Sequence, residues 1–313
     1  MQLNLKGGSI MTDSVPNDSQ TDRTNWLERV LTPFQRGTPP APRTATGFYT
    51  DTTVCIGCKA CEVACKQWNQ LPSDGFEWTG KSYDNTGELS ATSWRHVKFV
   101  EQLVDTQLPQ DTAIVEPLEA GTVPDLPGRW LMMSDVCKHC ATAPCEQACP
   151  TGSLLQNEFE NIYLQSDICN GCSYCIAACP FGVITRATFD GHAHKCTLCY
   201  DRQRDDLTPA CAKACPTESI QFGPIDELRE RARERVSELQ SLGINDAYLY
   251  GDEASENYSQ LNSFYLLIDE PSAYGLPDNP VNPWLFMKGD YLRSGLTGFI
   301  AIAMLLIILW LGG

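Results

Sequence analysis

The sequence predicts an α+β fold made of two similar halves, followed by a single apolar helix at the C-terminal end. Three observations predict it. Sixteen cysteines form four groups of four, short runs of strand-forming residues separate the groups, and residues 225–242 form a long amphipathic segment. Because the groups repeat along the chain, we expect the fold to consist of related units.

The cysteine spacing is the most specific pattern in the chain. Motifs I and III read C-x2-C-x2-C-x3-C; motif II widens one gap to four residues, and motif IV opens a gap of eleven. This spacing is typical of bacterial ferredoxins, in which thiolates bind [4Fe–4S] clusters. The motifs are I, Cys55, Cys58, Cys61, Cys65; II, Cys137, Cys140, Cys145, Cys149; III, Cys169, Cys172, Cys175, Cys179; IV, Cys196, Cys199, Cys211, Cys215.

Sixteen thiolates at four per cluster predict four [4Fe–4S] clusters, arranged as two ferredoxin-like halves with two clusters each. A disulfide framework is typical of short secreted chains with more than about 8–10% cysteine, and 16 in 313 residues is about 5%. Zinc sites use two C-x-x-C pairs or mixed Cys/His sets. Both alternatives fit the tight three-cysteine loops poorly.

The formal net charge of −16 leaves no basic surplus to meet phosphates, which excludes nucleic acid as a partner. Four lysines within the motifs are expected to be ordinary surface residues, with a role in raising cluster potentials as the alternative. The four histidines are likewise expected to be exposed. These residues are Lys59, Lys138, Lys195, Lys213, His96, His139, His192 and His194.

Four regions follow from the pattern. Residues 1–46 form a polar arm with a short amphipathic helix at 25–34, and 47–224 form the double dicluster domain. Residues 225–290 contain a helix, a strand and a proline-rich linker, and 291–313 form an anchor. Expected strands lie around 97–103, 130–133, 162–164, 183–185 and 263–268.

Residues 294–313 contain no charged side chain in 20 positions. A helix of this length measures about 30 Å, the hydrocarbon thickness of a bilayer, so we expect a single transmembrane anchor rather than a buried core helix. Lys288 and Arg293 precede the apolar run and nothing basic follows it, which favours a cytoplasmic position for the remainder of the chain. No signal peptide is apparent at the N-terminal end.

Residues outside the cysteines identify a family. Motif I with its neighbours, Cys55-Ile56-Gly57-Cys58-Lys59-Ala60-Cys61, resembles the iron–sulfur beta subunit of respiratory (membrane-bound, molybdenum or tungsten) formate dehydrogenase. The resemblance covers residue 47 to the C-terminal helix. Further matching stretches are Tyr83-Asp84-Asn85, Leu89-Ser90-Ala91-Thr92-Ser93-Trp94, Lys195-Cys196-Thr197-Leu198-Cys199, Pro209-Ala210-Cys211 and Tyr274-Gly275-Leu276-Pro277.

The resemblance implies an electron-transfer subunit without a catalytic site of its own. A catalytic molybdopterin (Mo/W) alpha subunit would donate electrons, and a membrane cytochrome b gamma subunit would accept them and reduce quinone. The alternative is a beta subunit of another molybdopterin oxidoreductase, of the nitrate, sulfoxide or polysulfide type. A stand-alone enzyme is a third reading, but the sequence shows no pterin, flavin or nucleotide motif.

The resemblance also implies crossed ligation, in which each pair of motifs shares its two clusters. The resemblance places the cluster-bearing region outside the cytoplasm, exported together with the alpha subunit. The positive-inside pattern favours the opposite side, so a cytoplasmic position remains an alternative. The implied ligand sets are cluster 1, Cys55, Cys58, Cys61, Cys215; cluster 2, Cys65, Cys196, Cys199, Cys211; cluster 3, Cys137, Cys140, Cys145, Cys179; and cluster 4, Cys149, Cys169, Cys172, Cys175.

Overall fold

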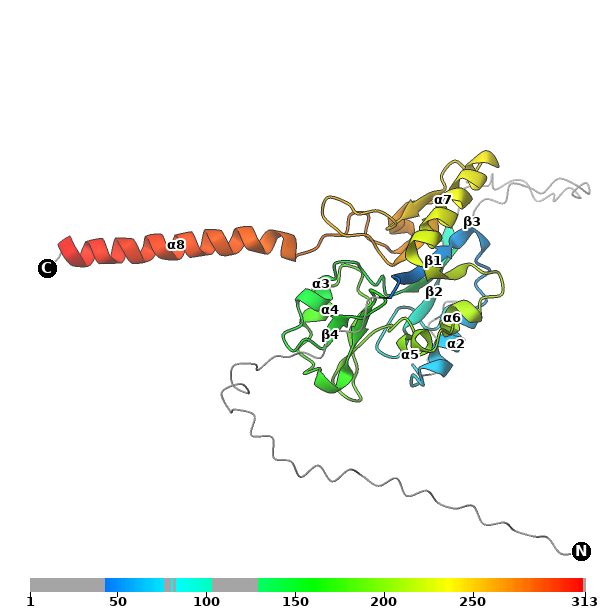
Figure 1. Ribbon diagram of the computed structural model, residues 1–313, viewed down its shortest axis with the longest axis horizontal. Coiled ribbons are helices and arrows are strands. Elements are labelled where there is room, and N and C mark those ends of the chain that lie inside the picture. Colours follow the sequence, from blue (N-terminus) through cyan, green and yellow to red (C-terminus); the bar gives the residue numbers. More distant parts are fainter. Residues whose placement is uncertain (1–42, 76–79, 81–82, 103–128, 312–313) are drawn as a thin grey trace, which may run out of the picture. The chain divides into compact units, whose positions relative to one another are not determined.

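A computed structural model of the chain describes residues 43–75, 80, 83–102 and 129–311. Its central element is a four-stranded sheet with strand order β8-β1-β10-β9 (Figure 1). The sheet joins segments that are far apart in the sequence, since β1 and β10 are parallel neighbours. The four strands are β1 (Thr46–Asp51), β8 (Ile220–Pro224), β9 (Tyr248–Tyr250) and β10 (Ser263–Leu267).

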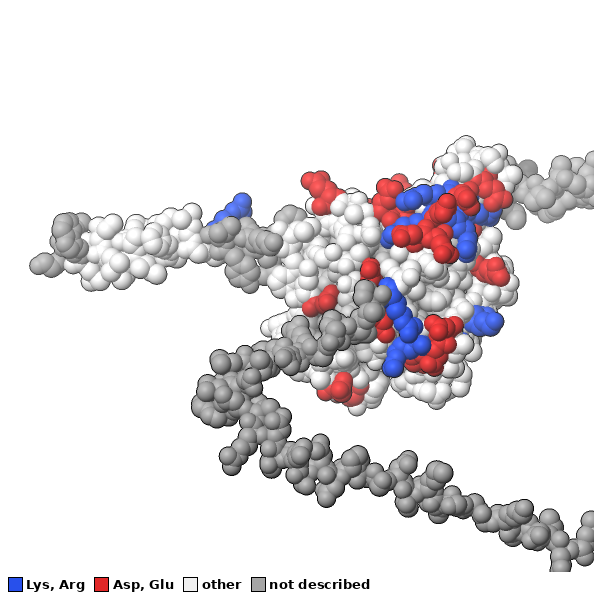
Figure 2. Space-filling model, viewed as in Figure 1, with Lys and Arg blue, Asp and Glu red and all other residues white. Residues whose placement is uncertain are grey.

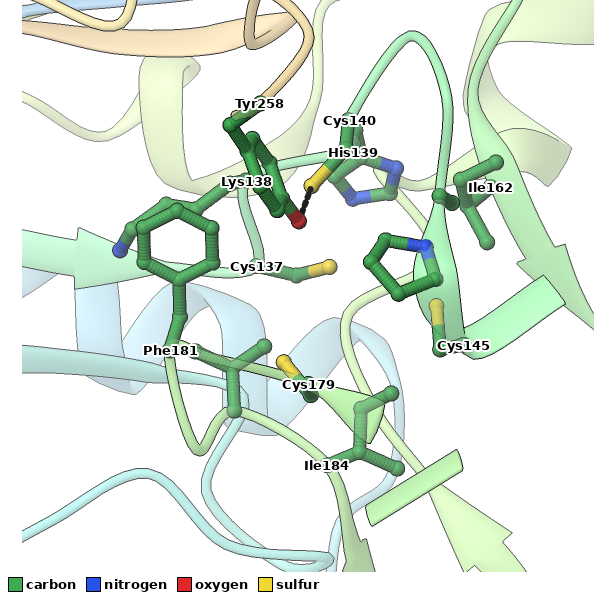
Figure 3. Close-up of a pocket in the computed structure, with 13 residues that line it drawn as sticks. Cys137, Lys138, His139, Cys140, Cys145, Ile162, Cys179, Phe181, Ile184 and Tyr258 are labelled. Carbon is green, nitrogen blue, oxygen red and sulfur yellow. Dashed lines mark hydrogen bonds between the residues drawn. The ribbon is translucent and has the colours of Figure 1, made fainter. Parts of the chain in front are cut away.

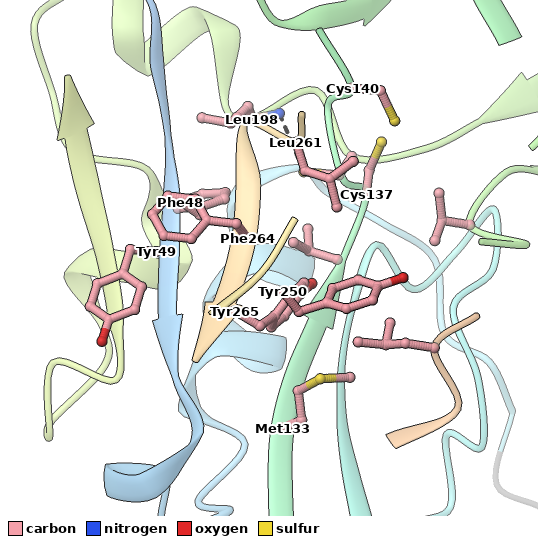
Figure 4. Close-up of a cluster of buried hydrophobic side chains, with 14 of the residues drawn as sticks. Phe48, Tyr49, Met133, Cys137, Cys140, Leu198, Tyr250, Leu261, Phe264 and Tyr265 are labelled. Carbon is pink, nitrogen blue, oxygen red and sulfur yellow. Dashed lines mark hydrogen bonds between the residues drawn. The ribbon is translucent and has the colours of Figure 1, made fainter. Parts of the chain in front are cut away.

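The two central strands form the middle of the hydrophobic core. Phe48 of β1 lies opposite Ser263 of β10 and Phe222 of antiparallel β8. All five residues of β10 are buried, as expected of a strand covered on both faces. Cys137 and Cys140 lie at the edge of this apolar cluster, so motif II packs directly against the core (Figure 4).

Three antiparallel hairpins surround the cysteine motifs. The predicted strands around 97–103, 130–133, 162–164 and 263–268 are confirmed within the described residues, although Leu103 lies outside them. The strand expected at 183–185 is wrong in position, because pairing there begins only at Thr185. The hairpins are β2 (Arg95–Gln102) with β3 (Arg129–Val136), β4 (Leu154–Gln156) with β5 (Ile162–Leu164), and β6 (Thr185–Arg186) with β7 (Ala193–His194).

Five short helices carry cysteines or begin directly after one. The loops of the described residues contain three 3₁₀ turns. The last of these turns lies in the proline-rich segment that was expected to be a linker. The helices are α2 (Ala60–Trp68), α3 (Pro144–Gln147), α4 (Tyr174–Ala178), α5 (Tyr200–Arg204) and α6 (Ala210–Lys213); the turns are η1 (Thr52–Val54), η2 (Ser166–Ile168) and η3 (Pro271–Tyr274).

The long amphipathic helix is confirmed as α7 (Ile225–Ser241). It buries Leu228, Ala232 and Leu239 from one face, as the 3.6-residue periodicity requires. Its other face carries acidic and basic side chains together, which appear as a mixed patch in Figure 2. Such a face is solvated, and the helix serves the fold by covering the sheet.

The last helix, α8 (Trp284–Leu311), begins earlier than the anchor expected at 291–313. Its side chains are described for 284–285, 293–307 and 309, and many apolar ones are exposed, including Leu296 and Phe299. Among the described residues, no helix is long and apolar enough to cross a membrane. The transmembrane anchor expected at 291–313 is therefore not supported by the described residues.

The described residues all belong to one compact unit, Pro42–Gly313. The polar arm expected at 1–46 and its amphipathic helix at 25–34 fall almost entirely outside the described residues. The unit Pro42–Gly313 contains all sixteen cysteines.

Candidate metal centres

The loops of motifs I and III share one backbone conformation. Gly57 and Lys59 have φ of 65° and 58°, and the equivalent Gly171 and Ser173 have φ of 68° and 67°. Left-handed residues placed this way turn successive backbone N–H groups towards one side, which forms a concave site for an anionic group. A Cβ added at Gly171 would meet the Gly191 carbonyl oxygen at 2.2 Å, so only glycine fits there.

Motif IV brings its cysteines beside motif I. Burial raises the pKa of Cys55, and the neighbouring Cys215 and Cys58 thiolates raise that pKa further. Cys61 has Cys211 as its thiol neighbour, which belongs to the adjacent predicted ligand set. After burial, the groups that raise the pKa of Cys65 are Cys196, Cys211 and Cys199.

Motif II and the end of motif III converge on one pocket. Figure 3 shows the sulfur atoms of Cys137, Cys140, Cys145 and Cys179 directed into the same space. Burial raises the pKa of Cys145, and the other three thiolates raise it further. The Tyr258 hydroxyl lies 3.1 Å from the Cys140 sulfur, and Tyr258 also lines this pocket.

The remaining four cysteines also lie together. Burial raises the pKa of Cys175 to about 11, followed by the effects of Cys149, Cys169 and Cys172. The neighbours thus group as the crossed ligation implies, except that Cys61 lies at the border of two groups. Proximity of thiols alone does not assign ligands, so the four ligand sets remain a prediction.

The cysteine sites fit iron–sulfur clusters chemically. All sixteen cysteines are free thiols, which overturns the disulfide alternative. Burial raises the pKa of Cys61 and Cys199 to about 11 and that of Cys140 to about 12, so these thiols hold their protons at neutral pH. Binding of an iron–sulfur core therefore releases the protons of these thiols, and the positively charged iron takes the place of those protons. No described group of three or more His, Cys, Asp or Glu side chains is arranged to hold a single metal ion.

The surface role expected for the motif lysines is wrong at two positions. Lys138 is 1% exposed, pairs with Asp135, and donates to the Tyr265 hydroxyl at 3.0 Å. Lys195 is equally buried and donates to the carbonyl oxygen of Cys196 at 2.8 Å. Lys213 is exposed as expected, whereas Lys59 is half-buried. Buried cations occur here because backbone carbonyls and a carboxylate meet their hydrogen-bonding needs.

Exposed positions for the histidines are wrong as well. His96 is buried, and its Nε2 lies 2.8 Å from a carboxylate oxygen of Asp84. His139 is completely buried, and neither of its ring nitrogens has a hydrogen-bond partner among the described residues. His192 and His194 are half-buried on either side of Ala193.

Three side chains that lie within 3.2 Å of a cysteine sulfur were not identified from the sequence. Arg95 Nη2 donates to the Cys211 sulfur at 3.2 Å, and the Ser134 hydroxyl lies 3.2 Å from the Cys61 sulfur. Tyr258 is the third, at Cys140. Each is far from its cysteine in the sequence, and only Arg95 had a local signal, since it directly follows the 89–94 stretch that carries the family resemblance.

Comparison with known proteins supports this reading of the site. Two family models, each described as a 4Fe-4S dicluster domain, match residues 54–153 and 128–225. The formate dehydrogenase-O iron-sulfur subunit of Escherichia coli (strain K12) is 37% identical over 255 residues, 80% of this chain and 78% of the relative. The chain belongs to the family of formate dehydrogenase iron–sulfur subunits.

Two further relatives define the breadth of this family. The nitrate-inducible formate dehydrogenase iron-sulfur subunit of E. coli is 36% identical over 271 residues, 84% of this chain and 83% of the relative. The B subunit of the anaerobic dimethyl sulfoxide reductase of E. coli is 31% identical over 188 residues, 60% of this chain and 78% of the relative. The formate dehydrogenase relatives are named as iron–sulfur subunits, and the dicluster family models match this chain as well, so its role is electron transfer.

Proposed function

We propose that this chain is the electron-transfer subunit of a formate dehydrogenase and conducts electrons through four [4Fe–4S] clusters. The observation that carries the proposal is the arrangement of sixteen free cysteines in four neighbouring groups within a family of formate dehydrogenase iron–sulfur subunits. Each group supplies soft thiolates in a buried setting, which suits iron–sulfur clusters. The clusters supply one-electron chemistry, and the chain supplies their spacing and surroundings.

The contacts between cysteine groups support a linear order of clusters, 1-2-3-4. Cys61 of the first set adjoins Cys211 of the second, and Cys137 of the third raises the pKa of Cys196 of the second after burial. Helix α3 bears Cys145 of the third set and precedes Cys149 of the fourth. An electron entering at one end would therefore pass each cluster in turn.

Exposure distinguishes the two ends of this line from its middle. Cys58 in the first set and Cys172 in the fourth are the exposed cysteines, and the second and third sets are mostly buried. The start of α8 contacts the half with clusters 3 and 4, where Trp284 Nε1 donates to the Pro144 carbonyl at 3.2 Å. We therefore assign the donor side to cluster 1 and the acceptor side to cluster 4.

The partners complete the proposal. A catalytic molybdopterin subunit carrying molybdenum or tungsten oxidises formate and donates electrons at cluster 1, and this chain needs no catalytic site of its own. A membrane cytochrome b accepts them, and the exposed apolar side chains of α8, such as Leu296 and Phe299, fit contact with such a hydrophobic protein. We place the cluster-bearing unit outside the cytoplasm, at the membrane surface, by co-export with the catalytic subunit.

The test is purification of the complex through an affinity tag on this chain, without oxygen. We expect about sixteen iron atoms per chain, a co-purifying molybdopterin subunit, and clusters that are reduced by formate and reoxidised by a quinone. Reoxidation of reduced clusters by dimethyl sulfoxide, with no reduction by formate, would favour the alternative that the sulfoxide reductase relatives represent. Zinc in place of iron would overturn both.

The ligand sets are tested by single substitutions in motif IV. Cys215→Ser should alter the paramagnetic signal of the cluster that motif I holds, and Cys211→Ser should alter a different signal, because crossed ligation separates these neighbours. If both variants change the same signal and leave the others intact, motif IV holds a cluster by itself. Cys215 and Cys211 lie in one short segment, so each variant is a matched control for the other.

A further inference from the structure

Arg95, the first residue of β2, is a buried cation that takes part in none of the ion pairs between described residues. Only 2% of the residue is exposed, and its guanidinium carbon lies 4.7 Å from the centre of the Phe48 ring. Its Nη1 donates to the Ser134 hydroxyl at 3.2 Å and to the Ser134 carbonyl at 3.4 Å. No carboxylate of a described residue lies within ion-pair distance of it, and its Nε has no hydrogen-bond partner among them.

The guanidinium lies between two groups of cysteines. Its Nη2 donates to the Cys211 sulfur at 3.2 Å. The Ser134 hydroxyl that accepts from Nη1 also lies 3.2 Å from the Cys61 sulfur. One cation therefore contacts the second predicted ligand set directly and the first through a single hydroxyl.

A buried charge without compensation is strongly unfavourable, and an arginine cannot escape that cost by losing its proton. Lys138 pairs with Asp135, whereas the hydrogen-bond acceptors of Arg95 among the described residues are a sulfur, a hydroxyl and a carbonyl group. Burial acts to lower the pKa of Arg95, whereas the thiolates of Cys211, Cys61 and Cys196 raise it. The negative charge that compensates Arg95 must come from the cysteine groups themselves.

We infer that Arg95 is a positioning residue that holds a fixed positive charge between clusters 1 and 2 and raises the reduction potentials of both. Reduction adds one electron to a cluster, and no proton moves at Arg95 because the guanidinium stays charged. The cation also weakens the repulsion between electrons on the two neighbouring clusters. This inference rests on the proposed function, since it requires iron–sulfur clusters at both cysteine groups.

The test compares Arg95→Met, Arg95→Lys and the control Arg229→Met in the purified complex. Arg229 is a buried arginine of α7 that pairs with Asp226 rather than with a sulfur. Cluster potentials are measured by dithionite titration followed by paramagnetic resonance, after iron content has been determined. Formate plays no part in this titration, so its outcome is separate from the test of the proposed function.

We expect Arg95→Met to make reduction of cluster 2 at least tenfold less favourable, a fall of about 59 mV for one electron. Cluster 1 should shift in the same direction by less, clusters 3 and 4 should not move, and Arg95→Lys should restore part of the potential. The control should match the wild type. Unchanged potentials in an iron-replete Arg95→Met protein, or an equal shift in all four clusters, would overturn the inference.

A second variant covers the case in which Arg95→Met fails to retain iron. Ser134→Ala removes the hydroxyl that connects Arg95 to Cys61 but keeps the cation beside Cys211. We expect the potential of cluster 1 to fall and that of cluster 2 to stay close to the wild-type value. If an iron-replete Ser134→Ala protein leaves the potential of cluster 1 unchanged, Arg95 does not act on that cluster through Ser134, and the inference is overturned.

Discussion

Replacing Lys138 by methionine removes the positive half of a buried ion pair. Lys138 pairs with Asp135, and its Nζ also donates to the Val136 carbonyl at 2.8 Å and to the Tyr265 hydroxyl at 3.0 Å. Burial alone would raise the pKa of Asp135, but Lys138 and Lys98 together hold it far below its usual range. Without Lys138, a buried carboxylate loses its closest cation.

Removing one partner of a buried ion pair typically costs about 3–5 kcal/mol. Lys98 remains 3.1 Å from the second carboxylate oxygen of Asp135, so we expect the lower end of the range, about 3 kcal/mol. At about 2–4 °C for each kcal/mol in a domain of this size, the apparent melting temperature should fall by about 6–12 °C. Methionine keeps most of the side-chain volume, so a cavity adds little.

The assay is thermal unfolding of the cluster-loaded protein, followed by circular dichroism at one fixed scan rate because loss of clusters makes unfolding irreversible. Lys98→Met is the matched control: it faces the same carboxylate but is 24% exposed, and its loss should cost about 1 kcal/mol or less. Combining Lys138→Met with Asp135→Leu should recover part of the stability. A Lys138→Met protein that melts no earlier than Lys98→Met would refute the reasoning.

Three further outcomes are expected. Gly171→Ala should lower the iron content by about one cluster, because the added Cβ would meet a backbone oxygen at 2.2 Å. The control Gly152→Ala, also at φ 68° but in open space, should retain its full iron content. Equal iron contents in the two variants would contradict this prediction. Tyr258→Phe removes one hydrogen bond to a thiolate, worth about 1–1.5 kcal/mol, and should lower one cluster potential by about 40–60 mV in a redox titration; a rise would refute it. Burial acts to raise the pKa of Asp84, but hydrogen bonds from Gly87 and other donors bring it down to about 2, below its ordinary value of 3.8. Its folded-state pKa is depressed, so the stability that Asp84 contributes is present above pH 3.8 and is lost as the pH falls towards 2. Cluster bleaching in Asp84→Asn should therefore be faster than in the wild type at pH 7, and the two bleaching rates should converge between pH 3.8 and pH 2. A ratio of the two rates that does not change with pH would count against the assignment.

The sequence predicted the features that depend on neighbouring residues. Helix α7 and the hairpin strand at Ile162–Leu164 follow from local periodicity, and the cluster sites follow from cysteine spacing. The central sheet was missed because β1 is a short segment whose partners are encoded about 170 and 215 residues later, as the pairs of Phe48 with Phe222 and Ser263 show.

The buried polar residues were missed for a related physical reason. A lysine or histidine is normally exposed, and only its partners justify burial. Those of Lys138 include Tyr265, which is 127 positions away, and Arg95 meets Cys211 across 116 positions. No local pattern reports such pairings, so the surroundings of the cysteines could not be derived from the motif spacing that located them.

The position of β1 between β8 and β10 determines when the central sheet can form during protein synthesis. Phe48 emerges from the ribosome early, but its partner Ser263 is made 215 residues later. At about 5–20 residues per second, the edge of β1 that pairs with β10 stays unpaired for roughly 10–40 s, although β8, the partner of the other edge, is made earlier. The central sheet is therefore completed only after most of the protein has been synthesised.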